Sequence, residues 1–83
     1  MDWYEQNIES PIRNIVKVLR NNGINTFCSC GHEMYIECET YDAEADLNTI
    51  YNVLIELGYD TYYAQVHDNI KNGYRNKFIE IKL

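Results

Sequence analysis

The chain has 83 residues, of which 46% are apolar, and a formal net charge of −6. This length allows one small domain and leaves no room for a second hydrophobic core, so we expect a single domain over residues 1–83. An acidic protein is repelled by phosphate groups, which argues against general nucleic-acid binding and binding to membrane surfaces. No apolar run approaches the roughly 20 residues that a membrane-spanning helix needs.

Cysteine usage favours a reducing compartment. The sequence has three cysteines, and Cys28 and Cys30 are separated by a single residue. An odd count with this tight spacing does not suit a disulfide framework. The first ten residues, MDWYEQNIES, are acidic and lack the apolar centre of a signal peptide. We therefore expect a cytoplasmic protein.

The basic residues gather toward the two ends of the chain. Between Asn21 and Ile70 there are nine acidic residues and no Lys or Arg. One interpretation is charge balance on a solvated surface, and the other is an acidic patch that binds a basic partner. The sequence leaves both interpretations open.

A first helix is predicted between Asn7 and Gly23. Ser10 suits the N-cap, Pro11 suits the first helical position, and Gly23 suits a left-handed exit. The spacing i, i+3, i+4, i+7 produces one apolar stripe, formed by Ile12, Ile15, Val16 and Leu19.

Two strands are predicted within residues 26–39, which hold all three cysteines and one of the two histidines. Three interpretations remain: a hairpin with cysteines as small strand residues, a zinc site of Cys28, Cys30 and His32, or a reactive Cys30 thiol assisted by His32. At a rise of ~3.3 Å per residue, an extended strand separates the first and last zinc candidates by ~13 Å. One zinc ion therefore needs the chain to curl at Gly31. We expect no cofactor, with zinc as the alternative.

A second helix is predicted between Asp42 and Gly58, with Asp42 as N-cap and Gly58 as the exit. Its apolar stripe is formed by Leu47, Ile50, Tyr51, Leu54 and Leu57.

The dipeptide Asn72-Gly73 predicts a two-residue hairpin turn, which pairs Lys71 with Tyr74. Counting outward gives two alternating sets of pairs, which lie on opposite faces of the sheet. The apolar set must face the helices: Val66–Ile79, Ala64–Ile81 and Tyr62–Leu83. The mixed set must face away: His67–Phe78, Gln65–Glu80 and Tyr63–Lys82.

The chain contains an internal repeat. Residues 15–27 match residues 50–62 at a constant offset of 35, and His32 then falls on His67. We interpret this match as a helix-strand-strand unit that occurs twice, over approximately residues 10–41 and 42–83, and the alternative is a chance similarity of two amphipathic helices. The repeat predicts a two-layer α+β fold in the order α-β-β-α-β-β, with two helices on one face of a four-stranded antiparallel sheet. The topology resembles a circularly permuted ferredoxin-like fold, with the second and fourth strands side by side at the centre.

Transferring the register of the second hairpin through the repeat gives the first hairpin the pairs His32–Tyr35, Cys30–Glu37 and Cys28–Glu39. The core face then carries Phe27, Ser29, Ile36 and Cys38. The opposite, open face carries the candidate binding residues: Cys30, His32, Tyr35, Glu37, Tyr63, Gln65, His67, Phe78 and Glu80, with Cys28, Glu39 and Lys82 beside them.

Exposed aromatic residues on a sheet favour a docking surface, and here they are Tyr35, Tyr63 and Phe78. The glutamates between them disfavour a phosphate backbone. We therefore expect a non-enzymatic interaction module that binds a protein partner or a second copy. The alternative is a metal- or ligand-binding protein centred on the Cys-x-Cys-Gly-His segment. A third arrangement folds the N-terminal segment over the face, with Trp3 and Tyr4 as its cover.

The segment VLRNNGINTFCSCGHEMYIECE, residues 18–39, resembles small proteins of phages and other bacterial mobile elements. In these, an amphipathic helix leads into a Gly-x-x-Thr step, a Ser-Cys-x-Gly-His motif and a Tyr-containing strand. The matching residues are Gly23, Thr26, Ser29, Cys30, Gly31, His32 and Tyr35, with no residue between the Cys and the Gly. The resemblance implies no activity, since these proteins have none assigned, but it draws attention to Cys30 and His32.

Overall fold

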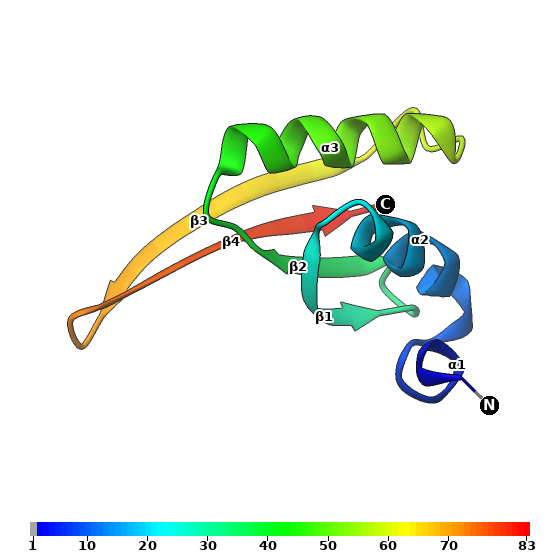
Figure 1. Cartoon of the computed structure of the whole chain (residues 1–83), viewed down its shortest axis with the longest axis horizontal. Coiled ribbons are helices and arrows are strands. Elements are labelled where there is room, and N and C mark those ends of the chain that lie inside the picture. The colour runs from blue at the N-terminus through cyan, green and yellow to red at the C-terminus, as the bar shows by residue number, and fades with distance from the viewer. Residues whose placement is uncertain (1) are drawn as a thin grey trace.

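The computed structural model describes residues 2–83, with Lys71 described by its backbone alone. Seven elements follow one another along the chain: α1 (Trp3–Asn7), α2 (Ser10–Asn21), β1 (Asn25–Cys30), β2 (Tyr35–Glu39), α3 (Ala43–Glu56), β3 (Tyr63–Lys71) and β4 (Tyr74–Lys82). The strands form one antiparallel sheet, on which α2 and α3 pack (Figure 1). The predicted α+β fold in the order α-β-β-α-β-β is confirmed, with α1 added in front of it.

Across the sheet the strands lie in the order β1-β2-β4-β3. The predicted position of β2 beside β4 at the centre is therefore confirmed. A ferredoxin-like β-α-β-β-α-β chain acquires this order when its first strand is moved to its end, because that strand keeps its inner place. The edges of the sheet are β1 and β3.

The core lies between the two long helices and one face of the sheet. The predicted apolar stripe of α2 is confirmed, since it is buried at all four positions. From α3 the core receives Ile50, Val53 and Leu54, whereas Tyr51 of the predicted stripe is 53% exposed. Alternate positions of the two central strands complete the core: Ile36, Cys38, Ile79 and Ile81.

The second long helix begins and ends where the sequence predicted. Asp42 is its N-cap, and the Asp42 carboxylate accepts a hydrogen bond from the backbone N–H of Ala45 at 3.2 Å. Gly58 follows the helix with a φ of +95°, a left-handed conformation that glycine adopts without strain.

The start of α2 differs from the prediction. The helix begins at Ser10, Glu9 occupies the N-cap position without a side-chain capping bond, and Asn7 belongs to the separate helix α1. The predicted helix start at Asn7 and the predicted N-cap at Ser10 were therefore wrong. The predicted left-handed exit at Gly23 is confirmed, with a φ of +87°.

The register of the second hairpin is confirmed from the turn as far as Tyr63 and Lys82, and the predicted pair Tyr62–Leu83 lies beyond the two strands. Asn72 and Gly73 both have positive φ, as a two-residue turn of this type requires. Every predicted pair between Tyr63 and Lys82 is present, and Ile79 and Ile81 point into the core. The turn residues therefore fixed the faces of both strands.

The first hairpin departs from the prediction. Cys30 pairs with Tyr35 and Cys28 with Glu37, so the two strands are displaced by two residues from the predicted register. The turn between them spans residues 31–34 and holds Met34 at a φ of 51°. The predicted pairing of His32 with Tyr35 was wrong, because it assumed that the first hairpin has a two-residue turn like the second. The turn of the first hairpin is longer, and His32 lies within it.

A bulge in β1 also changes the face of one aromatic residue. The register shifts between Thr26 and Cys28, so that Thr26 is buried opposite Cys38 while Phe27 is 56% exposed. The predicted place of Phe27 in the core was wrong, because an extra residue in one strand re-aims the side chains around it. Ser29 is half-buried and pairs with Ile36.

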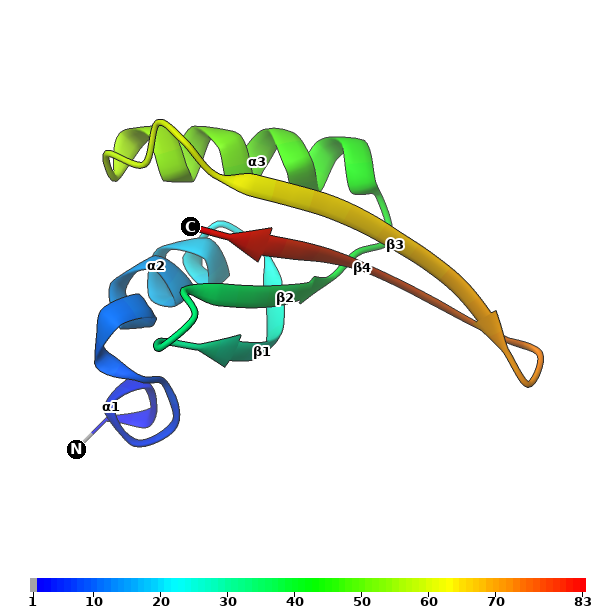
Figure 2. The same cartoon turned by 180° about the vertical axis from the view of Figure 1, so that it is seen from behind.

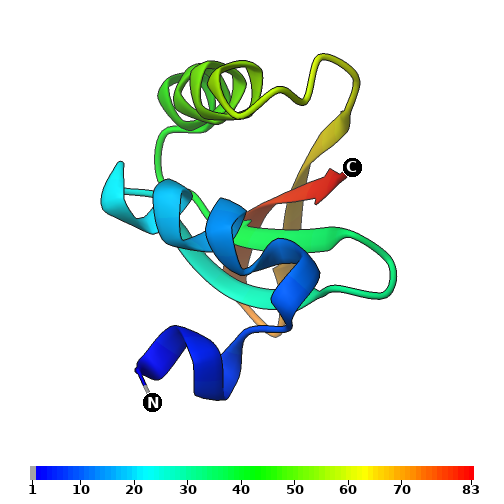
Figure 3. The same cartoon turned by 90° about the vertical axis from the view of Figure 1, so that its right-hand side faces the viewer.

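Helix α1 packs on the outer side of α2. The Arg20 guanidinium lies 4.7 Å from the centroid of the Trp3 ring, and Lys17 Nζ lies 5.7 Å from that of Tyr4. These contacts hold α1 at the β1 edge of the molecule, the edge opposite β3 (Figure 3). Within residues 2–83, no helix is long and apolar enough to cross a membrane.

Candidate functional site

The sheet face that points away from α2 and α3 carries three transverse rows of side chains, because antiparallel pairing aligns residues of neighbouring strands. The first row is Cys30, Tyr35, Lys82 and Tyr63, the second is Cys28, Glu37, Glu80 and Gln65, and the third is Glu39, Phe78 and His67. We call these eleven residues the open face. The structure thus brings together all the predicted face residues apart from His32.

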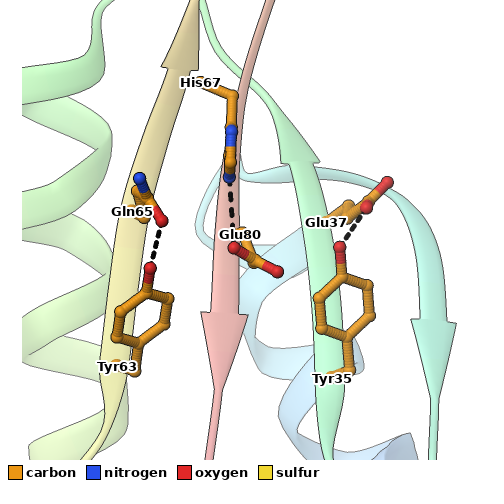
Figure 4. A network of polar contacts seen from close by, with 6 residues as sticks. All are labelled: Tyr35, Glu37, Tyr63, Gln65, His67 and Glu80. Carbon is orange, nitrogen blue, oxygen red and sulfur yellow. Dashed lines mark hydrogen bonds and ion pairs between the residues drawn. The ribbon is translucent and has the colours of Figure 1, made fainter.

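Two carboxylates stand side by side at the centre of the open face. Glu37 and Glu80 are directly paired residues of the two central strands. Each has one polar partner: Glu37 accepts a hydrogen bond from the Tyr35 hydroxyl, and Glu80 Oε1 lies 3.1 Å from His67 Nε2 (Figure 4). Like charges directly opposite each other destabilise a sheet. The two glutamates therefore place a local excess of negative charge in the middle of this face.

The strands on either side of β4 carry matching tyrosine contacts. The Tyr35 hydroxyl donates to Glu37 on β2, and the Tyr63 hydroxyl donates to Gln65 Oε1 on β3 (Figure 4). Lys82 lies between the two tyrosines, with its Nζ 6.0 Å from the centroid of the Tyr35 ring. Burial, followed by the hydrogen bond to Glu37, raises the pKa of Tyr35 above its usual value, so this phenol remains a donor at neutral pH.

The third row ends in a group of stacked rings. The His67 imidazole lies over the Phe78 ring with centroids 4.7 Å apart, and Phe27 meets the edge of Phe78 at 6.0 Å. Phe27 is therefore a face residue that sequence reasoning missed. The β1 bulge brings it there, and no local sequence signal marks that bulge.

The Cys-Gly-His turn is held by a contact to the start of α2. The Glu9 carboxylate accepts a hydrogen bond from the Gly31 backbone N–H at 3.0 Å. A Cβ added at Gly31 would lie 2.8 Å from Glu9 Cβ, which is closer than carbon atoms approach one another. The glycine thus has a packing role in this turn, while His32 next to it is exposed.

The three cysteines have different surroundings. Cys28 is exposed, Cys30 is half-buried, and Cys38 is buried against the helices, as predicted. Burial, with the nearby carboxylates of Asp46 and Glu37, raises the pKa of the Cys38 thiol to about 12. This thiol therefore remains protonated and unreactive at neutral pH.

Among residues 2–83, no three His, Cys, Asp or Glu side chains are close enough together to hold one metal ion. The zinc hypothesis for Cys28, Cys30 and His32 remains a prediction. Its test is the thermal midpoint with and without a chelator, since structural zinc contributes folding free energy. We expect equal midpoints, and a lower midpoint after chelation and in Cys30→Ser would support zinc.

Helix α1 leaves the centre of the open face uncovered. Trp3 reaches the β1 edge, where it borders a hollow of ≈ 390 Å³ together with Phe27 and Cys28. Tyr63, on the opposite edge strand, is 48% exposed. The arrangement in which Trp3 and Tyr4 cover the face is therefore not the one that the chain adopts.

The chain was compared with known proteins. No protein-family model, no curated protein and no solved structure matches it. The resemblance to phage and mobile-element proteins therefore remains an expectation from the sequence motif.

Proposed function

We propose that this chain is a non-enzymatic protein-interaction module, and that its open face docks a basic surface of a protein partner. The observation that carries this proposal is the pair of adjacent glutamates, Glu37 and Glu80, at the centre of a partly exposed face. A sheet that places two carboxylates directly opposite each other loses stability. A cation supplied by a partner would relieve that repulsion.

The surrounding rings favour arginine as the group that the partner inserts. A guanidinium forms strong, charge-assisted hydrogen bonds with carboxylates and also stacks on aromatic rings. The rows on either side of the glutamates offer such rings, namely Tyr35, Tyr63, Phe78 and His67. The open face thus offers carboxylates for the guanidinium at its centre and aromatic rings on either side, an arrangement that suits an arginine lying along the sheet.

The experiment is a titration with a defined probe, followed by the backbone amide shifts of the protein. The probe is an extended peptide that alternates arginine and valine, and its counterpart has glutamine in place of arginine. We expect only the arginine peptide to shift the amides of Glu37, Gln65 and Glu80. Because a hydrogen bond to a charged group is worth about 1.5–3 kcal/mol, the double variant Glu37→Gln/Glu80→Gln should weaken binding at least tenfold.

A matched control removes the same two charges elsewhere. Glu44 and Glu56 are exposed residues of α3, so Glu44→Gln/Glu56→Gln makes an equal change in net charge away from the open face. This control should bind the arginine peptide nearly as well as the wild type. Equal weakening by both double variants, or amide shifts centred on α3, would reduce the effect to general attraction and overturn the proposal.

A further inference from the structure

The β3–β4 hairpin extends far beyond the helix layer (Figures 1 and 2). Pairing between β2 and β4 ends at Glu39 and Phe78, whereas β3 and β4 remain paired as far as Lys71 and Tyr74. Residues 68–77 therefore form a two-stranded projection, which we call the hairpin arm. Along it, β4 has a strand neighbour on one side only within residues 2–83.

The outer edge of β4 in the arm is a free strand edge. The pair that flanks a two-residue turn exchanges hydrogen bonds, and such pairs alternate with non-bonded ones. Arg75 and Lys77 thus direct their backbone N–H and C=O groups away from β3. The structure uses one of these groups, since the Lys77 carbonyl accepts a hydrogen bond from the Thr40 N–H at 3.3 Å. The backbone of Arg75 is placed to pair with another strand.

The arm also exposes apolar side chains that its own chain does not bury. Ile70 is 77% exposed and Tyr74 is 79% exposed. A two-stranded hairpin is marginally stable by itself. Across the arm, Arg75 Nε donates to Asp68 Oδ1 at 2.8 Å, and the ion pair neutralises the charge at the middle of the arm.

At the base of the arm lies a hollow with exposed aromatic rings. A hollow of ≈ 480 Å³ is bordered by Phe27 and Tyr41, of which Tyr41 is 90% exposed, and by Glu39. The acidic start of α3, with Asp42 and Glu44, follows directly. The hollow is also bordered by Arg75 and Lys77, so it combines two aromatic rings with both acidic and basic side chains. It lies next to the base of the arm, whose tip exposes Ile70 and Tyr74.

The hairpin arm and the rest of the chain carry formal charges of opposite sign. Residues 68–77 contain three basic residues and one acidic residue, which gives the arm a charge of +2. The rest of the chain contains four basic and twelve acidic residues, which gives it −8. The arm of one copy is therefore attracted to the body of another.

From these observations we propose that two copies of this chain associate through their arms. The outer edges of the two β4 strands pair antiparallel about a twofold axis near Arg75, so each tip reaches the hollow at the base of the other arm. Ile70 and Tyr74 of one copy then pack against Phe27 and Tyr41 of the second. Both contacts form together, as a twofold interface requires. This surface is separate from the centre of the open face and does not rest on the function proposed above.

The test is sedimentation of the intact chain over a range of concentrations, with two matched variants. Ile70→Glu replaces an apolar contact residue at the tip by a charged one, whose burial against Phe27 and Tyr41 is unfavourable, and should weaken dimerisation at least tenfold. Ile55→Glu makes the same substitution on α3, where Ile55 is 41% exposed, and should leave the dimer unchanged. Amide spectra establish that both variants fold.

Hydrogen exchange tests the strand pairing without any substitution. The Arg75 amide should become protected as the protein concentration rises, while the amides of α3 keep their exchange rates. A chain that remains monomeric at millimolar concentration would overturn the proposal. A dimer that Ile70→Glu does not weaken, with Arg75 unprotected, would assign the contact to another surface. A monomer whose arm binds duplex DNA would assign the arm to nucleic acid instead.

Discussion

At the scale of single residues, burial separates the one core cysteine from the two on the open face. The Cys38 side chain is packed among apolar residues of the helices, and the pKa of its thiol lies at about 12 compared with an ordinary value of 9.0. Cys28, in contrast, is exposed to solvent. Both cysteines lie on β-strands, so the difference between a buried and an accessible thiol comes from the face of the sheet on which each side chain lies.

This difference predicts how stability depends on alkaline pH. Above pH 9 the Cys38 thiol ionises in the unfolded chain but not in the folded one. The folded state then binds more protons, so the free energy of unfolding falls as pH rises toward about 12. At pH 10.5, about 1.5 units above the unfolded pKa, the loss should be about 2 kcal/mol. Denaturant unfolding at pH 8 and pH 10.5 measures it.

Two variants isolate the contribution of the buried thiol. Cys38→Val keeps an apolar side chain at this position and should remove that part of the alkaline loss. Cys28→Ser alters an exposed thiol and should leave the loss intact. Equal pH dependence in the wild type and Cys38→Val would contradict the prediction.

Gly31 and Glu9 form a second residue-scale prediction. Gly31→Ala would place a Cβ 2.8 Å from Glu9 Cβ, so the turn or the start of α2 must move. Overpacking of this kind typically destabilises a protein by about 1–3 kcal/mol, and denaturant unfolding should show a loss in that range. In a Glu9→Gly background both Glu9 atoms that obstruct the new Cβ are absent and only Pro11 Cδ, at 3.0 Å, remains close, so the same substitution should be less destabilising. An equal loss in both backgrounds would mean that the contact with Glu9 is not the cause.

At the scale of elements, the two hairpins show what the sequence could and could not predict. Asn72-Gly73 is a local signal, because two adjacent positive φ values select one turn and hence one register. The first turn is held by Glu9, which lies 22 residues away from Gly31 in the chain. Local patterns carry no information about such a contact. The same reason explains why sequence patterns did not predict the bulge in β1, nor the position of Phe27 next to Phe78 of the open face.

Helix ends were predictable where a side chain caps them. Asp42 accepts a hydrogen bond from Ala45 N–H, and the sequence identified it correctly. Glu9, at the start of α2, makes no capping bond and instead holds the Gly31 turn. The prediction of Ser10 as N-cap failed because the helix already begins at Ser10, which leaves Glu9 at the N-cap position.

The Asp42 cap supplies an element-scale prediction. Asp42→Ala removes the acceptor for the first turn of α3 and should lower the free energy of unfolding by about 0.5–2 kcal/mol. Asp42→Asn keeps a capping oxygen and should retain most of the stability. Thermal or denaturant unfolding of the two variants checks this. A loss in Asp42→Asn as large as that in Asp42→Ala would point to charge, and not to capping, as the source of stability.

At the scale of the whole molecule, the two helix-strand-strand units differ in hairpin length. β1 and β2 have six and five residues, whereas β3 and β4 have nine each. The extra residues have no partner strand from the first unit, and so they project as the hairpin arm. Comparison of the two units therefore shows where the arm begins: it is the part of the second hairpin that has no counterpart in the shorter first hairpin.

Helix α1 lies outside that repeat, and its removal provides a whole-molecule prediction. Trp3 and Tyr4 stack on basic side chains of α2, in contacts worth about 0.5–1 kcal/mol each at exposed sites. Deleting residues 1–7 should therefore lower stability by about 1–2 kcal/mol on the same estimate and shift the amides of α2 and β1. The amides of Tyr63 and Gln65 should keep their shifts, because β3 lies at the edge of the sheet opposite α1.

Sedimentation of the deletion variant completes this test. Since α1 leaves the centre of the open face uncovered, its loss exposes no new apolar surface there, and the state of association should match that of the full chain at each concentration. The variant Trp3→Ala/Tyr4→Ala removes the two rings and keeps the chain length, so it should reproduce most of the lost stability. New self-association, or shifts spread over β3 and β4, would mean that residues 1–7 cover the open face in solution.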